Sequence, residues 1–329
     1  MIRSRRSLVL GVLLFCAVQA GLSRSIESDA LPVRDPIFTE KIERLRTHSE
    51  FWSNSTDRPR LLALGSSRTQ LLIDCDRLAP EFYTFNFGCS SCGTIAQSLY
   101  LRRLLDAGVH AEVLLIEIHP ALLAELPEPF EMRWLQPHRL RADESSALRE
   151  LGCSSDAAAT TDCHWFQSSS HYRRALLNEY APGLLPGSQA IRRNRTSDHR
   201  GYVLGIEPSP QRHFELTENS LREYGPAFAD YRPGGPACAA LERMIDLGQQ
   251  RGMHVVLFVT PESTAFQTAY GGAGNARFDA FLNRLSNERA VPILRSRGWL
   301  NDGDFADGHH ATPRGAAAFT DRLKGELPR

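Results

Sequence analysis

The stretch LLALGSSRTQ, residues 61–70, predicts a buried strand that ends at Gly65 and is followed by two serines and an arginine. An apolar run that stops at a glycine is typical of a strand inside a parallel sheet. Ser66 or Ser67 could simply cap the next helix, because a serine there accepts a hydrogen bond from the first turn. The alternative is that one of the two serines is a nucleophile.

Strand and helix patterns alternate on both sides of this stretch. Besides RLLALG at 60–65, the predicted strands are FYTFNFG, EVLLIEIH, HVVLFVT and PILRS, at 82–88, 112–119, 254–260 and 292–296. Helices are predicted at 69–78, 94–107, 238–251, 276–289 and 312–327. Five strands that alternate with helices predict an α/β fold, a three-layer α/β/α sandwich with a five-stranded parallel sheet.

The alternation stops between residues 120 and 236, where Pro, Gly, Arg and Ser are frequent. We interpret this segment as an insertion with a helix near 171–180 that covers the carboxyl edge of the sheet. Its aromatic and basic residues either fill a small core of the cap or face a sugar and its anionic groups. They are Trp134, Trp165, Phe166, Tyr172, Arg173, Arg174, Arg192, Arg193 and Arg195.

The amino-terminal residues have the order of a secretory signal. Three arginines at positions 3, 5 and 6 precede an apolar run from Leu8 to Val18, and Ala20 is a small residue at the expected cleavage site. The run is shorter than the roughly 20 residues of a membrane span, but an uncleaved anchor stays open. We expect a signal peptide at 1–20, a linker or helical segment at 21–58, and the α/β domain of an exported or envelope protein at 59–329.

Composition excludes several classes of function. The formal net charge is zero, so the basic surface of a nucleic-acid-binding protein is not expected. Lys41 and Lys324 are the only lysines, which excludes a phosphate-binding loop of the GxxxxGK type. No metal or organic cofactor is implied.

Six cysteines follow the expected signal peptide, and an even number in an exported chain indicates disulfides. Cys153 and Cys163 flank a polar loop and are the first candidate pair. The other four are Cys75, Cys89, Cys92 and Cys238, of which Cys89 and Cys92 could bond to each other or to the remaining two. A C-x-x-C that opens a helix also occurs in thiol–disulfide redox sites.

Several chemically active residues fall just after predicted strands, where ligands bind in parallel sheets. They are Ser67, Gly88, Glu117, Glu262 and Asp307. Near the carboxyl end of the chain, Asp307 and His310 lie three residues apart before a helix. A nucleophilic serine needs a base, and the base needs a carboxylate that orients it. A serine after the first strand, Ser66 or Ser67, is therefore a candidate nucleophile with His310 and Asp307, and His309 and Asp304 are an alternative base and partner.

These motifs resemble those of the SGNH (GDSL-like) hydrolases, near the bacterial envelope O-acyltransferase and DltD-like branches. The resemblance rests on Gly65-Ser66-Ser67-Arg68, Asn86-x-Gly88, and Asp307-x-x-His310 with Gly315, and it covers residues 59–120 and 236–329. It implies that Ser67 is the nucleophile, His310 the base and Asp307 its partner. It also implies an oxyanion hole formed by the backbone N–H groups of Ser67 and Gly88.

The sequence departs from the family pattern in two places. Ser66 and Arg68 stand where the family has Asp and Leu. The asparagine of the third block, whose amide is the third oxyanion donor, has no counterpart in IEIHPALL, where His119 is the candidate replacement. One such donor is worth ~2.7–4 kcal/mol of the barrier. Candidates for substrate binding are Arg68, Asn86, Glu117, His119 and Glu262, although each could instead have a purely structural role.

The sequence thus predicts a serine esterase or O-acyltransferase that acts on acyl esters, above all acetyl esters, of an exported or envelope glycan or of a small molecule. Membrane association through the amino terminus is part of this expectation. Two other classes stay open. One is a non-catalytic glycan-binding protein on the same scaffold, which the missing asparagine would suit. The other is a redox protein that uses Cys89 and Cys92.

Overall fold

The computed structural model describes residues 2–28, 30–31, 33–54, 56–133, 135, 139–141, 143–153, 168–185 and 197–328. The chain divides into two compact units. The N-terminal unit comprises Met1–Glu40 and Gln136–Asn194, and the sheet unit comprises Lys41–Leu135 and Arg195–Arg329. The predicted cap at 120–236 is therefore shared between the two units. Some residues singled out in the sequence lie outside the described residues, namely Trp134, Cys163, Trp165, Phe166, Arg192, Arg193 and Arg195.

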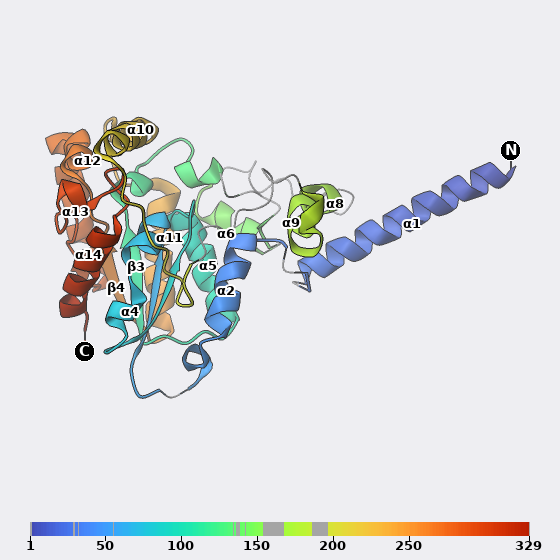
Figure 1. Ribbon diagram of the computed structural model, residues 1–329, viewed down its shortest axis with the longest axis horizontal. Helices are drawn as coiled ribbons and strands as arrows, with labels where there is room; N and C mark the ends of the chain where they lie inside the picture. The colour runs from blue at the N-terminus through green and yellow to red at the C-terminus, as the bar shows by residue number, and fades with distance from the viewer. Residues whose placement is uncertain are drawn as a thin grey trace. The chain divides into compact units, whose positions relative to one another are not determined.

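The N-terminal unit is helical where it is described. Its first helix, α1 (Ile2–Glu27), is continuous (Figure 1) and extends beyond the predicted signal end at residue 20. Residues Ser7–Glu27 are long and apolar enough to cross a membrane. The other helices are α6 (Glu144–Glu150), α8 (Ser168–His171), α9 (Arg173–Tyr180) and η6 (Pro182–Leu184). The boundary between the units falls within α2 (Pro36–Arg46).

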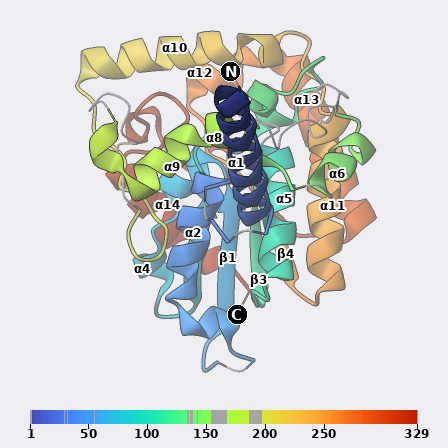
Figure 2. The same cartoon turned by 90° about the vertical axis from the view of Figure 1, so that its right-hand side faces the viewer.

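The sheet unit is built on five parallel strands, as predicted. They are β1 (Arg60–Gly65), β2 (Tyr83–Gly88), β3 (Val113–Ile118), β4 (His254–Val259) and β5 (Ile293–Leu294). The strand order is β2-β1-β3-β4-β5, and Figure 2 shows β1, β3 and β4 side by side. The chain changes direction across the sheet between β1 and β3. In sheets of this order, ligands bind at the carboxyl ends of the strands at that switch point.

Helices cover both faces of the sheet and complete the predicted three-layer sandwich. One layer contains α5 (Thr94–Asp106) and α11 (Gly235–Gln250), which contact each other and the strands. The other contains α3 (Ser67–Leu72), α4 (Cys75–Leu78) and α14 (Pro313–Glu326). Short helices flank the sandwich: η1 (Ser49–Trp52), η2 (Pro120–Leu123), η3 (Phe130–Arg133), α12 (Thr264–Ala269) and η7 (Asp302–Asp304). The longer α13 (Gly271–Arg289) precedes β5.

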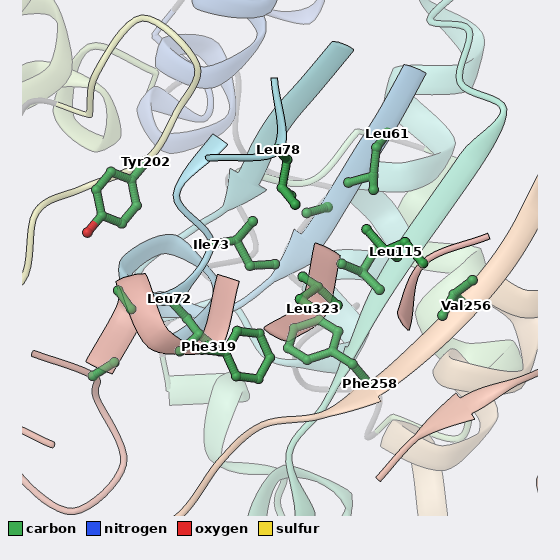
Figure 3. Packing of buried hydrophobic residues seen from close by; sticks show 14 of the residues in the cluster. Leu61, Leu72, Ile73, Leu78, Leu115, Tyr202, Val256, Phe258, Phe319 and Leu323 are labelled. Carbon is green, nitrogen blue, oxygen red and sulfur yellow. The ribbon is translucent and has the colours of Figure 1, made fainter. Parts of the chain in front are cut away.

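Alternate residues of the strands pack against the layer that contains α14. Leu61 of β1, Leu115 of β3 and Phe258 of β4 belong to one buried cluster with Phe319 and Leu323 of α14 (Figure 3). Successive side chains of a strand point to opposite faces, so each central strand is apolar over most of its length to supply both layers. This double burial explains why the strands appear in the sequence as unbroken apolar runs.

Two helix predictions were wrong. The segment 69–78 was expected to be one helix, but α3 ends at Leu72 and α4 begins at Cys75. Asp74 starts the second helix by accepting a hydrogen bond from the backbone N–H of Asp76, as a helix cap does. The second error is an omission. Helix α10 (Pro210–Phe228) lies in the inserted segment, where no helix was predicted at these residues.

The two ends of the inserted segment are paired in a closed neck within the sheet unit. Ala124 and Pro233 form an antiparallel bridge. Beside it, the N–H of Glu125 donates to the carbonyl of Arg232 at 2.8 Å, and the N–H of Gly234 donates to that of Leu123 at 3.0 Å. The two ends of the insertion are therefore held together by backbone pairing.

The disulfides suggested among four of the cysteines are not formed. Cys75, Cys89 and Cys238 carry free thiols. Each lies at a different place: the sulfur of Cys75 near the carbonyl of Arg200, that of Cys89 near Phe87, and that of Cys238 near Leu123. Burial raises the pKa of Cys75 well above its ordinary value and that of Cys238 to about 12, so both act as small buried side chains.

A glycine in α11 tests how tightly this helix packs on the sheet. A Cβ at Gly248 would lie 2.7 Å from Val255 of β4 and 2.9 Å from Leu114 of β3. We expect Gly248→Ala to lower the free energy of unfolding by ~1–3 kcal/mol through overpacking, as measured by urea unfolding. The control is Gly325→Ala in α14, where a Cβ meets no atom within 4 Å. There the better helix former should be neutral or add up to ~1 kcal/mol. Equal effects of the two substitutions would contradict this packing.

Candidate active site

The two serines after β1 have different roles. Ser66 is the N-cap of α3, and its side chain accepts a hydrogen bond from the N–H of Arg68. Ser67 is the first residue of the helix, and its Oγ lies 2.7 Å from Nε2 of His310. The capping interpretation therefore holds for Ser66, whereas Ser67 meets the residue predicted to be its base.

His310 and Asp307 are brought together by a tight turn. Nδ1 of His310 lies 2.7 Å from Oδ2 of Asp307, and the backbone N–H of His310 donates to Oδ1 at 2.8 Å. Gly308 has a φ of +86°, a left-handed conformation that favours glycine. The turn leads into Thr312, which caps α14 by accepting a hydrogen bond from the N–H of Gly315. Gly315 has no room for a side chain, because a Cβ there would collide with the carbonyl of Asp304.

The carboxylate of Asp307 is held in its ionised form. Burial by itself would raise its pKa, but the imidazoles of His309 and His310 and the hydrogen bonds donated by His310 lower that pKa well below its ordinary value. An ionised Asp307 fixes the tautomer of His310 that carries a proton on Nδ1, which leaves Nε2 free to accept the proton of Ser67. The hydrogen-bonded chain Ser67–His310–Asp307 thus has the direction that a nucleophilic serine requires.

His309 does not serve as an alternative base. Its Nδ1 lies 3.6 Å from Asp307 without a hydrogen bond. Asp304, its suggested partner, instead bonds to Arg314 and to the N–H of Asn301. Burial lowers the pKa of His309 well below its ordinary value, so this imidazole is neutral and packs edge-on against the ring of Tyr224.

Glu117 is a positioning residue of the turn that carries Ser67, and not a substrate ligand as the sequence suggested. One of its oxygens accepts from the N–H of Ser66 at 2.8 Å and from the N–H and hydroxyl of Thr69, and the other accepts from the Ser66 hydroxyl at 2.7 Å. The side chain is buried and is not part of the pocket beside Ser67. Its carboxylate therefore ties β3 to the β1–α3 connection.

Gly88 and Asn86 do not contribute to an oxyanion hole. The N–H of Gly88 donates to Oδ1 of Asn86 at 2.9 Å, so it is not available to a substrate. The amide of Asn86 donates to the carbonyls of Thr69 and Ile73, at 2.8 and 2.9 Å. Asn86 is buried and holds β2 against α3. Gly88 is the last residue of β2 and still pairs in register with Gly65 of β1. Its N–H therefore lies within the sheet and not in the loop beyond it.

His119 and Glu262 are also removed from the list of substrate ligands. Nε2 of His119 lies 3.2 Å from Glu262, and both side chains are buried behind the pocket. Glu262 accepts from Arg297 at 2.6 Å and from the hydroxyl of Tyr270 at 3.0 Å. Burial and the nearby charge of Arg68 lower the pKa of His119 to about 4. His119 is not part of the pocket lining, so its imidazole does not replace the missing oxyanion donor.

A pocket of about 210 Å³ opens beside Ser67 and His310. The inserted segment supplies much of its wall, which the sequence did not reveal at the level of residues. Phe130 and Glu131 come from η3, and Ser220 and Tyr224 come from α10. The other lining residues are Ser66, Ser67, Arg68, Ser91, Cys92, Gly93, Leu122, Glu223, Asp307, His309 and His310.

Glu131 reaches from the inserted segment to the first turn of α5. Its carboxylate accepts from the N–H of Ile95 at 3.0 Å and from that of Ala96 at 2.9 Å. It thereby supplies the cap that the N-cap residue, Gly93, lacks. Burial raises the pKa of Glu131 to about 7, although these hydrogen bonds partly offset the effect. A serine, threonine or aspartate cap close to α5 in the sequence would have been recognisable, but this one lies 36 residues away.

Two other chemistries are less well supported by this geometry. Asp307, His309 and His310 have ligand atoms within 4.8 Å of one another. However, the nearest atoms of Asp307 and His310 already bond to each other, and Nε2 of His310 faces Ser67. For the redox alternative, Cys89 is only 1% exposed, whereas an attacking thiol must be accessible.

Neither known protein-family models nor curated proteins match the chain. The function is therefore inferred from the geometry around Ser67 and from the motifs in the sequence.

Glu117→Gln tests the positioning of the turn. One oxygen becomes an NH₂ group, which faces either the Ser66 hydroxyl or the N–H groups of Ser66 and Thr69, and a buried unsatisfied group costs ~1–3 kcal/mol. We expect lower stability in urea unfolding and slower reaction of Ser67 with a fluorophosphonate. The control, Glu326→Gln, changes an exposed carboxylate and should leave both measurements as they are. Unchanged labelling in the Glu117 variant would contradict the positioning role.

Glu131→Gln tests the raised pKa of Glu131. In the folded protein burial raises the pKa of this carboxyl to about 7, compared with 4.5 for a glutamate in water. The folded state then binds more protons than the unfolded state between these values, so stability falls as pH rises through this window. We expect the wild type to lose stability from about pH 5 to about pH 7.5 relative to the Gln variant, in unfolding curves measured at each pH. Parallel curves would show that Glu131 ionises normally.

Proposed function

We propose that this protein is a serine esterase or O-acyltransferase of the SGNH type. The observation that carries the proposal is the hydrogen-bonded chain from Ser67 Oγ through His310 to Asp307, at 2.7 Å for each link, on the wall of a pocket. A base within hydrogen-bond reach of a serine, itself oriented by a buried carboxylate, is the arrangement that activates a hydroxyl nucleophile.

The proposed reaction proceeds in two acyl transfers. Nε2 of His310 takes the proton of Ser67 while Oγ attacks the acyl carbonyl, which forms a tetrahedral intermediate. His310 then returns this proton to the departing alcohol as its bond to the acyl carbon breaks, and the acyl group stays on Ser67. Water or a sugar hydroxyl next attacks the acyl-serine, His310 accepting its proton and returning it to Ser67 Oγ. Asp307 stabilises the imidazolium at both stages.

The oxyanion hole of this proposal differs from the one expected from the sequence. The backbone N–H of Ser67 lies in the first turn of α3, where helix N–H groups have no intrahelical acceptor. The N–H of Gly88 is occupied by Asn86, and the backbone of Gly93 at the start of α5 is hydrogen-bonded to the carboxylate of Glu131. We therefore assign the donor role to the backbone N–H of Ser67.

The size of the pocket favours a short acyl group. A cavity of about 150 Å³ holds a benzene molecule, and the pocket here is about 210 Å³. Leu122 and Phe130 give it an apolar side suited to a methyl or short alkyl group. The apolar helix at Ser7–Glu27, as a signal or an anchor, would take the catalytic unit to the cell envelope, where an acylated glycan is the proposed substrate.

A fluorophosphonate probe followed by intact-mass analysis tests the nucleophile. We expect one adduct on the wild type and none on Ser67→Ala, with loss of short-chain ester hydrolysis by about 10³-fold or more in that variant. Asp307→Asn should lower kcat by up to about 10⁴-fold, because the amide favours the wrong tautomer of His310.

The matched control is Ser146→Ala, which removes an exposed hydroxyl that bonds locally to Asp143. It should label and turn over like the wild type. Labelling that persists in Ser67→Ala would end the proposal. Glycan binding without any ester turnover would support the non-catalytic alternative instead.

A further inference from the structure

Arg68 carries a buried positive charge with few partners. Its side chain lines the pocket beside Ser67, and the residue is 3% exposed. Its Nη1 lies 3.5 Å from the hydroxyl of Ser66, whereas Nε and Nη2 have no hydrogen-bond partner among the described residues. A buried guanidinium with unused donors is costly unless a partner completes its hydrogen bonds.

The carboxylates nearest to this guanidinium make their hydrogen bonds elsewhere. Glu117 accepts from Ser66 and Thr69, and Glu262 accepts from Arg297 and Tyr270. Both influence the charge of Arg68 only at a distance. The protein therefore places a cation next to the nucleophile without giving it a paired carboxylate.

The groups around Arg68 leave its positive charge available to an anion. The ring of Tyr224 lies 5.1 Å from the guanidinium carbon, a favourable cation–π distance. Burial keeps His309 neutral, and Asp307 is engaged by His310. Glu131 has a pKa raised by burial to about 7, so its negative charge is only partly developed at neutral pH. Glu223 is exposed, where water and salt screen it.

We propose that Arg68 binds an anionic group of the substrate, a carboxylate, sulfate or phosphate, that lies a few bonds from the ester. This inference rests on the proposed function. A guanidinium binds such groups through two parallel hydrogen bonds, and Nε and Nη2 are the unused donors that can supply them. Ser67 and Arg68 are adjacent in the chain, so their Cα atoms are about 3.8 Å apart. The anionic group and the ester must therefore be close together in the same molecule. The substrate class is therefore an ester of an acidic sugar or of another small acid.

Two pairs of esters that differ in one charge test this subsite. 4-Nitrophenyl butyrate and 4-nitrophenyl hemisuccinate place the charge on the acyl side, whereas phenyl acetate and 3-acetoxybenzoate place it on the alcohol side. We expect the wild type to favour the anionic member of one pair, and Arg68→Met to lower kcat/KM for that member by about 10- to 100-fold more than for its neutral partner. This range is that of a hydrogen bond to a charged group. The pair that responds identifies the side on which the anion sits.

Arg284→Met is the control, because Arg284 pairs with Glu242 and Glu288 away from the pocket. It should leave the preference unchanged. Arg68→Lys keeps the charge without the planar fork and should retain part of the preference, which provides a second variant if Arg68→Met does not fold. No preference in either pair, or an equal loss on both members in the Arg68 variants, would overturn the inference.

A direct measurement separates this inference from the proposed function. Inorganic sulfate should raise the Tm of the wild type and of Arg284→Met more than that of Arg68→Met or Arg68→Lys, at matched ionic strength. If Ser67 is labelled but sulfate stabilises all variants equally, the function stands and the subsite fails. If no ester is turned over and Ser67 is not labelled, the function fails, and the sulfate comparison still decides whether Arg68 binds an anion.

Discussion

The hydrogen bonds between the carboxylate of Glu117 and the turn after β1 are the constraint on which the site depends. Glu117 stands at the end of β3, and Ser66 and Thr69 flank Ser67, so the register between two neighbouring strands determines where the serine lies. His310 lies in the loop before α14. The hydrogen bond of 2.7 Å between its Nε2 and Ser67 Oγ joins the two parts of the site. Removing this buried carboxylate would leave the donors of Ser66 and Thr69 without their acceptor and loosen the turn.

The sequence was most informative where burial dictates composition. All five strands were predicted because parallel strands packed on both faces are continuously apolar, and their boundaries differ from the structure by at most two residues at an end. The break between α3 and α4 was missed because Ile73 and Asp74 fit a helical pattern, and only the cap at Asp74 marks it. Helix α10 was missed although Ser209 and Pro210 are a good start signal, because it lies in a region rich in Pro, Gly and Arg and about half of its residues are exposed.

The candidate triad could be predicted because its residues lie in short local motifs, whereas the rest of the site depends on tertiary contacts. Glu117, Asn86 and Glu262 are polar residues at strand ends, as ligands would be, yet each is used inside the protein. Their partners come from other elements, which a linear pattern does not contain. Tyr224 and Glu131 line the pocket although they belong to the insertion. A linear pattern does not reveal these tertiary contacts either. A polar residue at a strand end therefore indicates where the site lies more reliably than it indicates what that residue does there.

The closed neck at Ala124 and Pro233 has a consequence for how this scaffold could diversify. The neck pairs the two ends of the insertion, and Glu131, Arg200 and Val203 beyond it also bond to the sheet unit. The stretch that belongs to the other unit is Gln136–Asn194. The entropy of closing a loop grows only slowly with its length, by about 0.6 kcal/mol for each doubling. Long stretches could therefore be lost, gained or exchanged between copies of the gene at little thermodynamic cost. Natural variation in such a lineage should accumulate within Gln136–Asn194, while the strands, the nucleophile turn and the pocket wall stay constant.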